Sequence, residues 1–355
     1  MAGVLAIGWA SSSLWRPSSE VPANTPNSPW EPAQLEVLGD TLTMRDANQQ
    51  VLWHQQFKVP LREFYSPATG VDGAALMRAT AIVDLDGDGH KEVLLARTDP
   101  ADPTVYCFNR DGHERFTYVN ERPVRFGTDR CPPVRFDAIY VDTASGRAPA
   151  VWITGHHAEN FPSVLQRIDA SGRARSEYWS NGFIGAFRVL QLGGRRLTFV
   201  GANNNETGGA SVAVFEGEVT GSAPAVQPKY QCTGCLAGGP STFLVFPRSR
   251  FQQELSAGAT VRQFIRSAND RVTVEVIAGG LPGTDTPIAI AYYTLDRDLR
   301  LVHAEMGSGF VPLQRKYQAE HRVTAATRFT GETDLYPVRR WNGHGYDLIS
   351  GPELK

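Results

Sequence analysis

The sequence predicts an all-β protein, most simply a β-propeller of five four-stranded blades. The chain has 355 residues, of which 34 are glycine and 23 are proline, and so many turn-forming residues are unusual in a helical protein. Hydrophobic residues make up 41% of the chain and charged residues 20%, which is enough apolar material to bury a large core. The third observation is a repeated unit of two hairpins, which recurs along most of the chain.

The first half of this unit is a hairpin of two short apolar runs around a polar turn. The clearest copy begins at Ala81, ends at Ala96 and encloses a turn rich in aspartate and glycine. Apolar runs separated by such turns are typical of β-hairpins. Five copies can be identified, at residues 81–96, 138–153, 187–200, 261–277 and 336–349.

The second half is another hairpin, and only four copies follow a first half. They lie at 105–118, 164–179 and 288–304, with a less clear copy at 210–215. The fifth copy lies near the other end of the chain, at 41–53. A sheet shared between both termini closes a ring of sheets and hides strand edges. We therefore expect 41–53 and 336–349 to form one closing blade. Six or seven blades are the alternative if long insertions hide strands.

The segments outside the repeats differ in composition. Residues 1–15 are uncharged, too short to span about 30 Å of hydrocarbon as a helix, and lack the basic residues of a secretory signal. They are interpreted as part of a membrane anchor whose start is missing, an atypical export signal or a tail. Residues 16–33 contain five prolines and are typical of an extended linker. The propeller takes up 34–355, with insertions at about 221–260 and 307–335. The second insertion includes one short amphipathic helix, predicted at 310–321.

The turn of the clearest hairpin carries the strongest chemical motif. Its sequence, DLDGDGHKE, places carboxylates at positions 1, 3, 5 and 9, with glycine after the second and third aspartates. Oxygen atoms that converge in a tight loop are the ligands that Ca²⁺ prefers, at six to eight per ion. The predicted ligands are Asp84, Asp86, Asp88, the main-chain carbonyl of His90, and Glu92. A solvated turn without metal, or a site for Mg²⁺ or Mn²⁺, is the alternative.

The segment Thr80–Leu94 resembles the FG-GAP/VCBS repeat, which occurs in the propeller of integrin α-chains and in many bacterial surface proteins. The resemblance implies a β-propeller with Ca²⁺ in the loop between the first two strands of a blade. The other four copies lack the full set of carboxylates, so we expect one structural Ca²⁺. The family does not fix one activity, because its bacterial members append the propeller to membrane-anchored kinases or regulators, or use it for adhesion.

Four cysteines are too few for a disulfide scaffold. Cys232 and Cys235 form a C-x-x-C pair, for which a local disulfide is favoured over a redox pair, half of a zinc site or free thiols. Cys107 lies on a predicted strand and Cys131 in the following loop, so these two could also pair.

The remaining polar clusters give weaker signals. His156, His157 and Glu159 group on one loop, where a metal or acid–base site competes with an ordinary polar loop. The loop 203–206 is a possible ligand contact. Trp53, Trp152 and Trp179 lie on predicted strands, where they are expected in the core between blades rather than as sugar platforms.

The function expected from the sequence is that of a non-enzymatic, calcium-stabilised extracytoplasmic module for binding, sensing or adhesion. Its partner would be a protein or a glycan, and the N-terminus would tether it to a membrane. A net charge of −2 argues against nucleic-acid binding. The alternative is a carbohydrate-active propeller enzyme, a glycoside hydrolase or lyase, which needs a pair of catalytic carboxylates that the sequence does not reveal.

Overall fold

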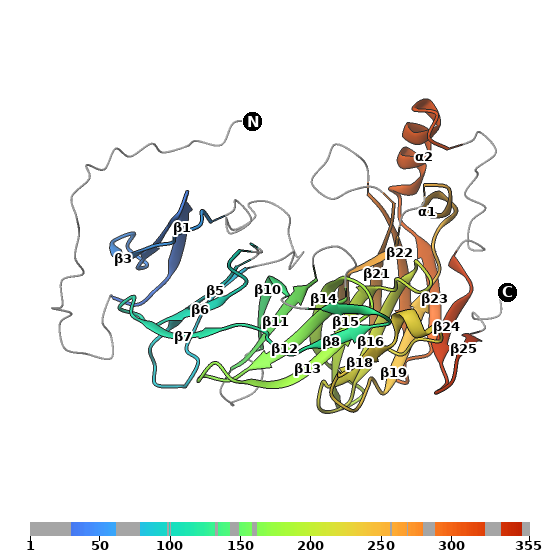
Figure 1. The fold of residues 1–355 in the computed structure, drawn as a ribbon. Coiled ribbons are helices and arrows are strands. Elements are labelled where there is room, and N and C mark those ends of the chain that lie inside the picture. Colours follow the sequence, from blue (N-terminus) through green and yellow to red (C-terminus); the bar gives the residue numbers. More distant parts are fainter. Residues whose placement is uncertain are drawn as a thin grey trace.

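Most of the regular secondary structure of the protein is β-strand, arranged as a row of sheets (Figure 1). The computed structural model describes residues 30–61, 79–97, 99, 101–131, 134–142, 149–157, 162–255, 258–267, 269–279, 288–323 and 335–349. The segment 1–15 and all but the last four residues of the predicted linker 16–33 lie outside these ranges. No helix among the described residues is long and apolar enough to cross a membrane.

Two sheets form the N-terminal part of the row. The first has three strands, β1 (Gln34–Leu38), β2 (Thr41–Arg45) and β3 (Val51–Gln56). The second is a four-stranded antiparallel meander of β4 (Thr80–Val83), β5 (Glu92–Ala96), β6 (Val105–Phe108) and β7 (Glu114–Tyr118). The hairpins β2–β3, β4–β5 and β6–β7 were predicted by the repeat, whereas β1 was not.

The third sheet repeats this meander. It contains β10 (Arg135–Asp142), β11 (Ala150–His156), β12 (Ser163–Ile168) and β13 (Ala174–Ser180), with the short β17 (Gly221–Ser222) added in parallel to β13. The C-terminal meander contains β20 (Thr260–Ser267), β21 (Arg271–Gly279), β22 (Ala289–Leu295) and β23 (Leu301–Met306).

A six-stranded sheet lies between these two meanders. Its first strands are β14 (Ile184–Leu192), β15 (Arg195–Asn203) and β16 (Ala210–Phe215). The fourth is β19 (Thr242–Phe246), and the edge is completed by β24 (Val338–Trp341) and β25 (Tyr346–Ile349). The expected insertion at 221–260 therefore hides a strand, and its apolar sequence TFLVF is the signal that could have revealed it.

Smaller elements connect the sheets. The hairpin of β8 (Val124–Phe126) and β9 (Asp129–Cys131) pairs with β18 (Cys232–Thr233), which follows one turn of 3₁₀ helix (Pro228–Tyr230). The short helix α1 comprises Arg250–Glu254. The helix α2 (Phe310–Ala319) occupies the segment predicted to be helical and buries Phe310, Leu313 and Tyr317.

The hairpins that form the second half of each unit share one turn geometry. In the turns that begin at Asp46, Asn109, Asp169 and Asp296, the first residue donates its N–H to the residue four positions later and accepts an N–H from the residue three positions later. The fourth residue of each turn has positive φ, and it is glycine in two of the four turns. Because four hairpins share this turn, the repeat seen in the sequence is also a repeat of backbone structure.

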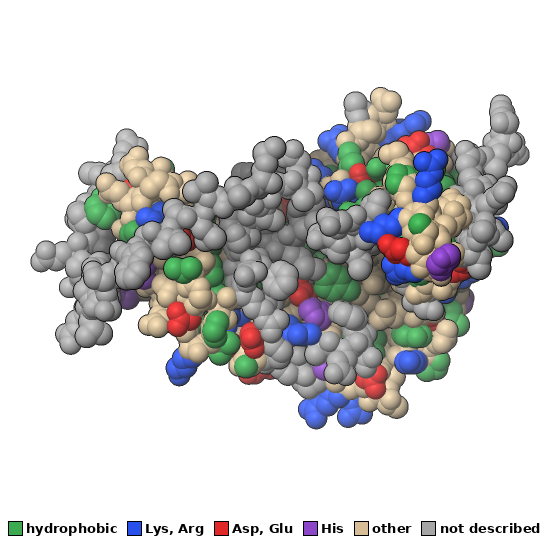
Figure 2. Space-filling view, turned by 90° about the horizontal axis from the view of Figure 1, so that it is seen from above, with side chains coloured by type: hydrophobic (Ala, Val, Ile, Leu, Met, Phe, Trp, Pro, Cys, Tyr) green, Lys and Arg blue, Asp and Glu red, His purple; other side chains and the backbone are tan. Residues whose placement is uncertain are grey.

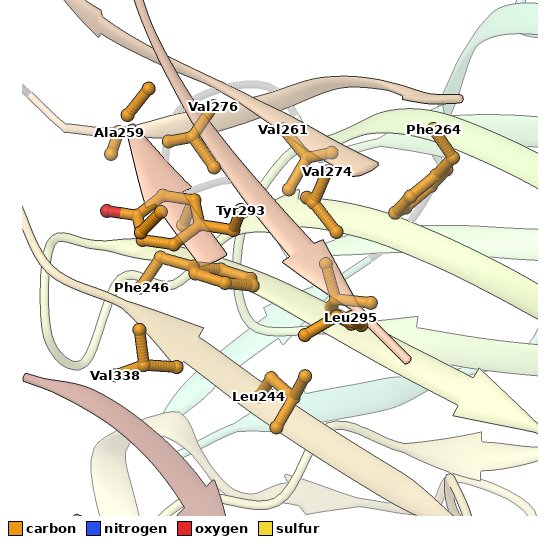
Figure 3. Packing of buried hydrophobic residues seen from close by; sticks show 14 of the residues in the cluster. Leu244, Phe246, Ala259, Val261, Phe264, Val274, Val276, Tyr293, Leu295 and Val338 are labelled. Atoms are coloured by element: carbon orange, nitrogen blue, oxygen red, sulfur yellow. The ribbon is translucent and has the colours of Figure 1, made fainter. Parts of the chain in front are cut away.

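Consecutive sheets pack face to face through aromatic side chains. Ring centroids are 5.6 Å apart for Trp53 and Phe108, 5.9 Å for Tyr118 and Phe136, and 5.1 Å for Trp152 and Phe187. Between the six-stranded sheet and the C-terminal meander, Phe246 and Tyr293 are 4.5 Å apart (Figure 3). Trp53, Trp152 and Trp179 are all less than 7% exposed, so these tryptophans belong to the core, as predicted.

Two turn glycines show how closely neighbouring sheets approach. A Cβ atom on Gly112 would lie 2.8 Å from the ring of Trp53, and one on Gly172 would lie 2.5 Å from the ring of Phe116. In both cases the turn of one meander lies against an aromatic residue on the last strand of the preceding sheet. Positive φ favours glycine at this position, and in these two turns the lack of space for a Cβ atom requires it.

The prediction that residues 41–53 and 336–349 form one closing blade is wrong. The hairpin β2–β3 pairs with β1, whereas β24 pairs with β19, so the two terminal hairpins belong to different sheets. Figure 1 shows β1–β3 and β24–β25 at opposite ends of the row. No sheet formed by the described residues joins the two ends of the chain. The physical reason is that each terminal hairpin has another partner: β2 pairs with β1, the strand directly before it in the chain, and β24 pairs with β19.

Asp169 provides a test of the shared turn. Its carboxylate accepts hydrogen bonds from the N–H groups of Ser171 and Arg173, from the Ser171 hydroxyl and from Arg175. Partial burial opposes ionisation, but these hydrogen bonds outweigh it and hold the pKa of the Asp169 carboxyl below its usual range. The stabilisation is therefore present above pH of about 4 and is lost as the pH falls below it.

We expect Asp169→Ala to lower the free energy of unfolding by about 1–3 kcal/mol at pH 7, because charged hydrogen bonds to the turn are lost. Urea unfolding at pH 7 and at pH 3 measures the effect, which should shrink at the lower pH. The exposed Glu218→Ala is the control and should change little at either pH. An equal loss at both pH values would contradict the role of the ionised carboxylate.

Candidate functional site

The aspartate-rich turn joins β4 to β5 and forms a tight loop. Gly87 and Gly89 have φ values of +80° and +89°, which residues other than glycine rarely adopt. These two glycines bend the loop so that the carboxylates of three aspartates face one another. One oxygen each from Asp84, Asp86 and Asp88 lies within 4.8 Å of the others. Three of the predicted calcium ligands are thus brought together.

The same aspartates also order the loop. Asp84 accepts the N–H groups of Gly87 at 2.7 Å and Gly89 at 3.0 Å through its two oxygens. Asp88 accepts the N–H of His90 at 2.7 Å, and Asp86 accepts the N–H of Asp88 at 3.2 Å. Because the loop backbone positions the carboxylates, their convergence does not depend on long flexible side chains.

Glu92 lies at the base of the turn and is held apart from the three aspartates. It is 3% exposed, and its Oε2 atom accepts the N–H of Leu85 at 2.8 Å. Its Oε1 atom is 2.9 Å from Nη1 of Arg115, whose Nη2 is 2.7 Å from Oδ2 of Asp86. Burial raises the pKa of the Glu92 carboxyl, and the hydrogen bond from Arg115 lowers that of Asp86.

Glu31 covers the side of the turn. Its Oε1 atom is 2.7 Å from Nδ1 of His90 and 3.4 Å from Nη1 of Arg110, and its Oε2 accepts the N–H of Lys91 at 3.0 Å. Nδ1 of His90 is therefore engaged by Glu31 and by Nη1 of Arg110, which lies 3.1 Å away. Sequence reasoning missed Glu31 and Arg115, since both are distant in the chain and neither belongs to a motif.

The arrangement is suited to a hard cation. Four carboxylates lie in or under one turn, and Arg115 is paired with only two of them. Asp84, Asp86 and Asp88 could supply the side-chain oxygens, whereas Glu92 would have to leave Arg115 or the N–H of Leu85 to join them. In the next meander, Asp142 occupies the position that Asp84 has in this hairpin. Its carboxylate is paired with Arg196, whereas no arginine is paired with Asp84 among the described residues.

A second polar pair lies on the third sheet. Asp137 occupies a β-bulge in β10, and its Oδ2 atom is 2.7 Å from Nδ1 of His156 at the end of β11. Asp137 is 7% exposed, and burial raises the pKa of its carboxyl. The ring of His156 packs edge-on against Phe183. This buried pair accounts for one of the two histidines predicted at the loop; Glu159 lies outside the described residues.

The loop 203–206 is tied into the fold. The carboxylate of Glu206 accepts the N–H groups of Val226 and Gln227 and the hydroxyl of Tyr346. Asn204 is fully buried and accepts the N–H of Thr207 through its side chain. These residues hold neighbouring segments together through hydrogen bonds within the fold.

The four cysteines fall into two classes. Cys232 and Cys235 form a disulfide, with Cα atoms 6.0 Å apart. It closes the segment that carries β18, the strand paired with β8. Cys107 and Cys131 are buried free thiols and do not pair with each other.

Comparisons with known proteins leave the family open. No family model matches the chain, and no curated protein matches it. A protein of unknown function from Bacteroides caccae is 11% identical, with 78% of this chain and 94% of that chain covered and a TM-score of 0.28. A member of the DUF4221 family from Bacteroides vulgatus is 10% identical, with 75% and 74% covered and a TM-score of 0.31. BBS1N, solved in complex with ARL6DN, is 8% identical, with 80% and 85% covered and a TM-score of 0.29. Likenesses of this strength decide neither the blade count nor the function.

Burial makes a clear prediction for thiol chemistry. It raises the pKa of Cys107 to about 12 and that of Cys131 to about 11, so neither thiol ionises appreciably at pH 8. We expect no thiol of the folded protein to react with iodoacetamide at pH 8, two to react after unfolding in guanidinium, and four after unfolding and reduction. Mass spectrometry counts the labels. Four labels without reduction would contradict the Cys232–Cys235 disulfide.

Proposed function

We propose that this protein is a calcium-stabilised binding module without enzymatic activity, which works outside the cytoplasm and presents its loops to a protein or glycan partner. The convergence of Asp84, Asp86 and Asp88 within 4.8 Å at the β4–β5 turn is the observation that carries the proposal. One Ca²⁺ would be held by these three carboxylates and by main-chain carbonyl and water oxygens.

Electrostatics favour a cation at this turn. Two carboxylates about 5 Å apart repel each other by about 1 kcal/mol even when fully solvated, and by more as the surroundings become less polar. Arg115 offsets part of this repulsion at Asp86 and Glu92 but contacts neither Asp84 nor Asp88. A divalent ion would neutralise the remaining charge. Ca²⁺ fits better than Mg²⁺ because it accepts irregular sets of six to eight oxygen ligands.

The ion would have a structural role. It would fix the turn between the first two strands of a meander, and Glu92 would connect that turn to the buried strand β5. A cation whose coordination is filled by the turn leaves little Lewis acidity for catalysis.

The sheets support a propeller-like assembly. We regard β1–β3, the three meanders and the six-stranded sheet as five blades, because the same turn recurs in four of them and consecutive sheets pack face to face. The chain ends contribute to separate blades in this proposal. The Cys232–Cys235 disulfide supports an oxidising compartment, since disulfides persist mainly outside the cytoplasm. Tethering through the N-terminal segment remains part of the proposal.

Calcium removal tests the site. We expect 1 mM CaCl₂ to raise the melting temperature of the EDTA-treated protein by about 3–5 °C, because an ion that binds only the folded state stabilises it by about 2.7 kcal/mol at a hundred times its Kd. Asp86→Asn should remove most of this response. Asp142→Asn, in the equivalent turn of the next meander, is the matched control and should keep it. Differential scanning calorimetry measures the shifts.

An unchanged melting curve in wild type with and without calcium, together with no calcium in elemental analysis, would refute the site. Turnover in a screen of polysaccharides would refute the non-enzymatic assignment and favour the glycoside hydrolase or lyase. Binding to a glycan or protein array without turnover is the result expected for a binding module.

A further inference from the structure

A cationic pocket opens at one end of the six-stranded sheet, away from the aspartate turn. It has a volume of about 280 Å³. Its walls come from the loop before β16, the end of β19, the start of α1 and the start of β24. These segments meet because Ala210 at the start of β16 is paired with Phe246 at the end of β19, and Val245 is paired with Arg339 near the start of β24.

Three arginines line this pocket, and none of the described residues that line it is acidic. They are Arg248, Arg250 and Arg339. Most ion pairs in the described part of the structure are made by arginine side chains. Arg248 and Arg339 differ from these arginines, because no described carboxylate forms an ion pair with either of them. The protein as a whole has a net charge of −2, so this local excess of positive charge is not a consequence of a basic composition.

Arg248 lies close to the loop that precedes β16. It is half-buried, and a Cβ atom on Gly208 would lie 2.9 Å from its Nε atom, so the guanidinium lies directly over the backbone of that loop. Gly208 has a φ of +70°, which keeps the loop in a shape that leaves room for the guanidinium.

The pocket also has an apolar wall. Phe246 is fully buried and packs against Tyr293, so the apolar groups that a ligand can reach are the partly exposed rings of Tyr336 and Pro337 on the chain entering β24. Thr207 and Gln253 add polar groups that can form hydrogen bonds. One side of a ligand would therefore meet positive charge and the other the rings of Tyr336 and Pro337.

We propose that this pocket binds a monosaccharide-sized molecule that carries a carboxylate, sulfate or phosphate group. Arg248 and Arg339 would bind the oxyanion through paired N–H groups, and Tyr336 and Pro337 would contact the ring. The volume lies just below the range of about 300–1,000 Å³ for small-molecule sites, so the pocket suits one sugar ring rather than a long chain. The inference rests on the proposed binding function and names its ligand class.

Isothermal titration calorimetry in 20 mM NaCl tests the proposal. The probes are glucuronate, glucose 6-sulfate, glucose 6-phosphate and uncharged glucose, and the three charged probes show which oxyanion is preferred. We expect at least one charged sugar to bind at least ten times more tightly than glucose. Binding should weaken in 200 mM NaCl, because the contact is electrostatic.

The double variant R248Q/R339Q should bind that sugar at least ten times more weakly. R266Q/R297Q removes two exposed arginines elsewhere, makes the same change in net charge and should bind as wild type does. A circular dichroism melt checks that both variants fold. No binding of any charged sugar at 10 mM, or equal binding by wild type and R248Q/R339Q, would overturn the proposal.

The calcium response separates this inference from the proposed function. A protein that is stabilised by Ca²⁺ but binds no charged sugar would overturn the pocket and leave the calcium site intact. A protein that binds a charged sugar without any response to Ca²⁺ would support the pocket and overturn the calcium site.

Discussion

The whole structure depends on sheets that are buried on both faces. In β5, β16 and most of β11 and β15, every residue is buried, so both faces of these strands need an apolar neighbour. Such a sheet is stable only inside a row, and the aromatic contacts between consecutive sheets meet this requirement. In β1, by contrast, exposed and half-buried residues alternate, as expected at the end of a row. Burial therefore sets the order of the sheets.

Local structure could be predicted from the sequence, but long-range pairing could not. Nearly every hairpin was identified, because alternating apolar runs and turn residues such as Asp169 and Gly172 act over a few neighbours. The partner of β24 depended on which strand edges remained free, and β19 was hidden in a loop. The sequence around a strand does not show which distant strand it pairs with. The count of hairpins therefore predicted a shared closing blade that the structure does not contain.

At the candidate site, too, the residues close together in the sequence could be predicted and the distant ones could not. Asp84, Asp86 and Asp88 could be predicted from their spacing, because the loop that joins them is only a few residues long. Arg115 and Glu31 reach the turn from β7 and from the segment before β1, so only the fold reveals them. They change the chemistry of the turn, since Glu92 and His90 are already engaged before any metal binds. The pocket lined by Arg248, Arg250 and Arg339 likewise depends on three strands that meet only in the folded chain.

The pairing of β18 with β8 has a consequence for biosynthesis. The ribosome would release the hairpin β8–β9 about a hundred residues before β18, the strand that covers its edge. During that interval the edge of β8 would be open to pairing with other chains. Folding of the nascent protein would thus pass through a stage at which chaperones that shield strand edges have the greatest effect on yield.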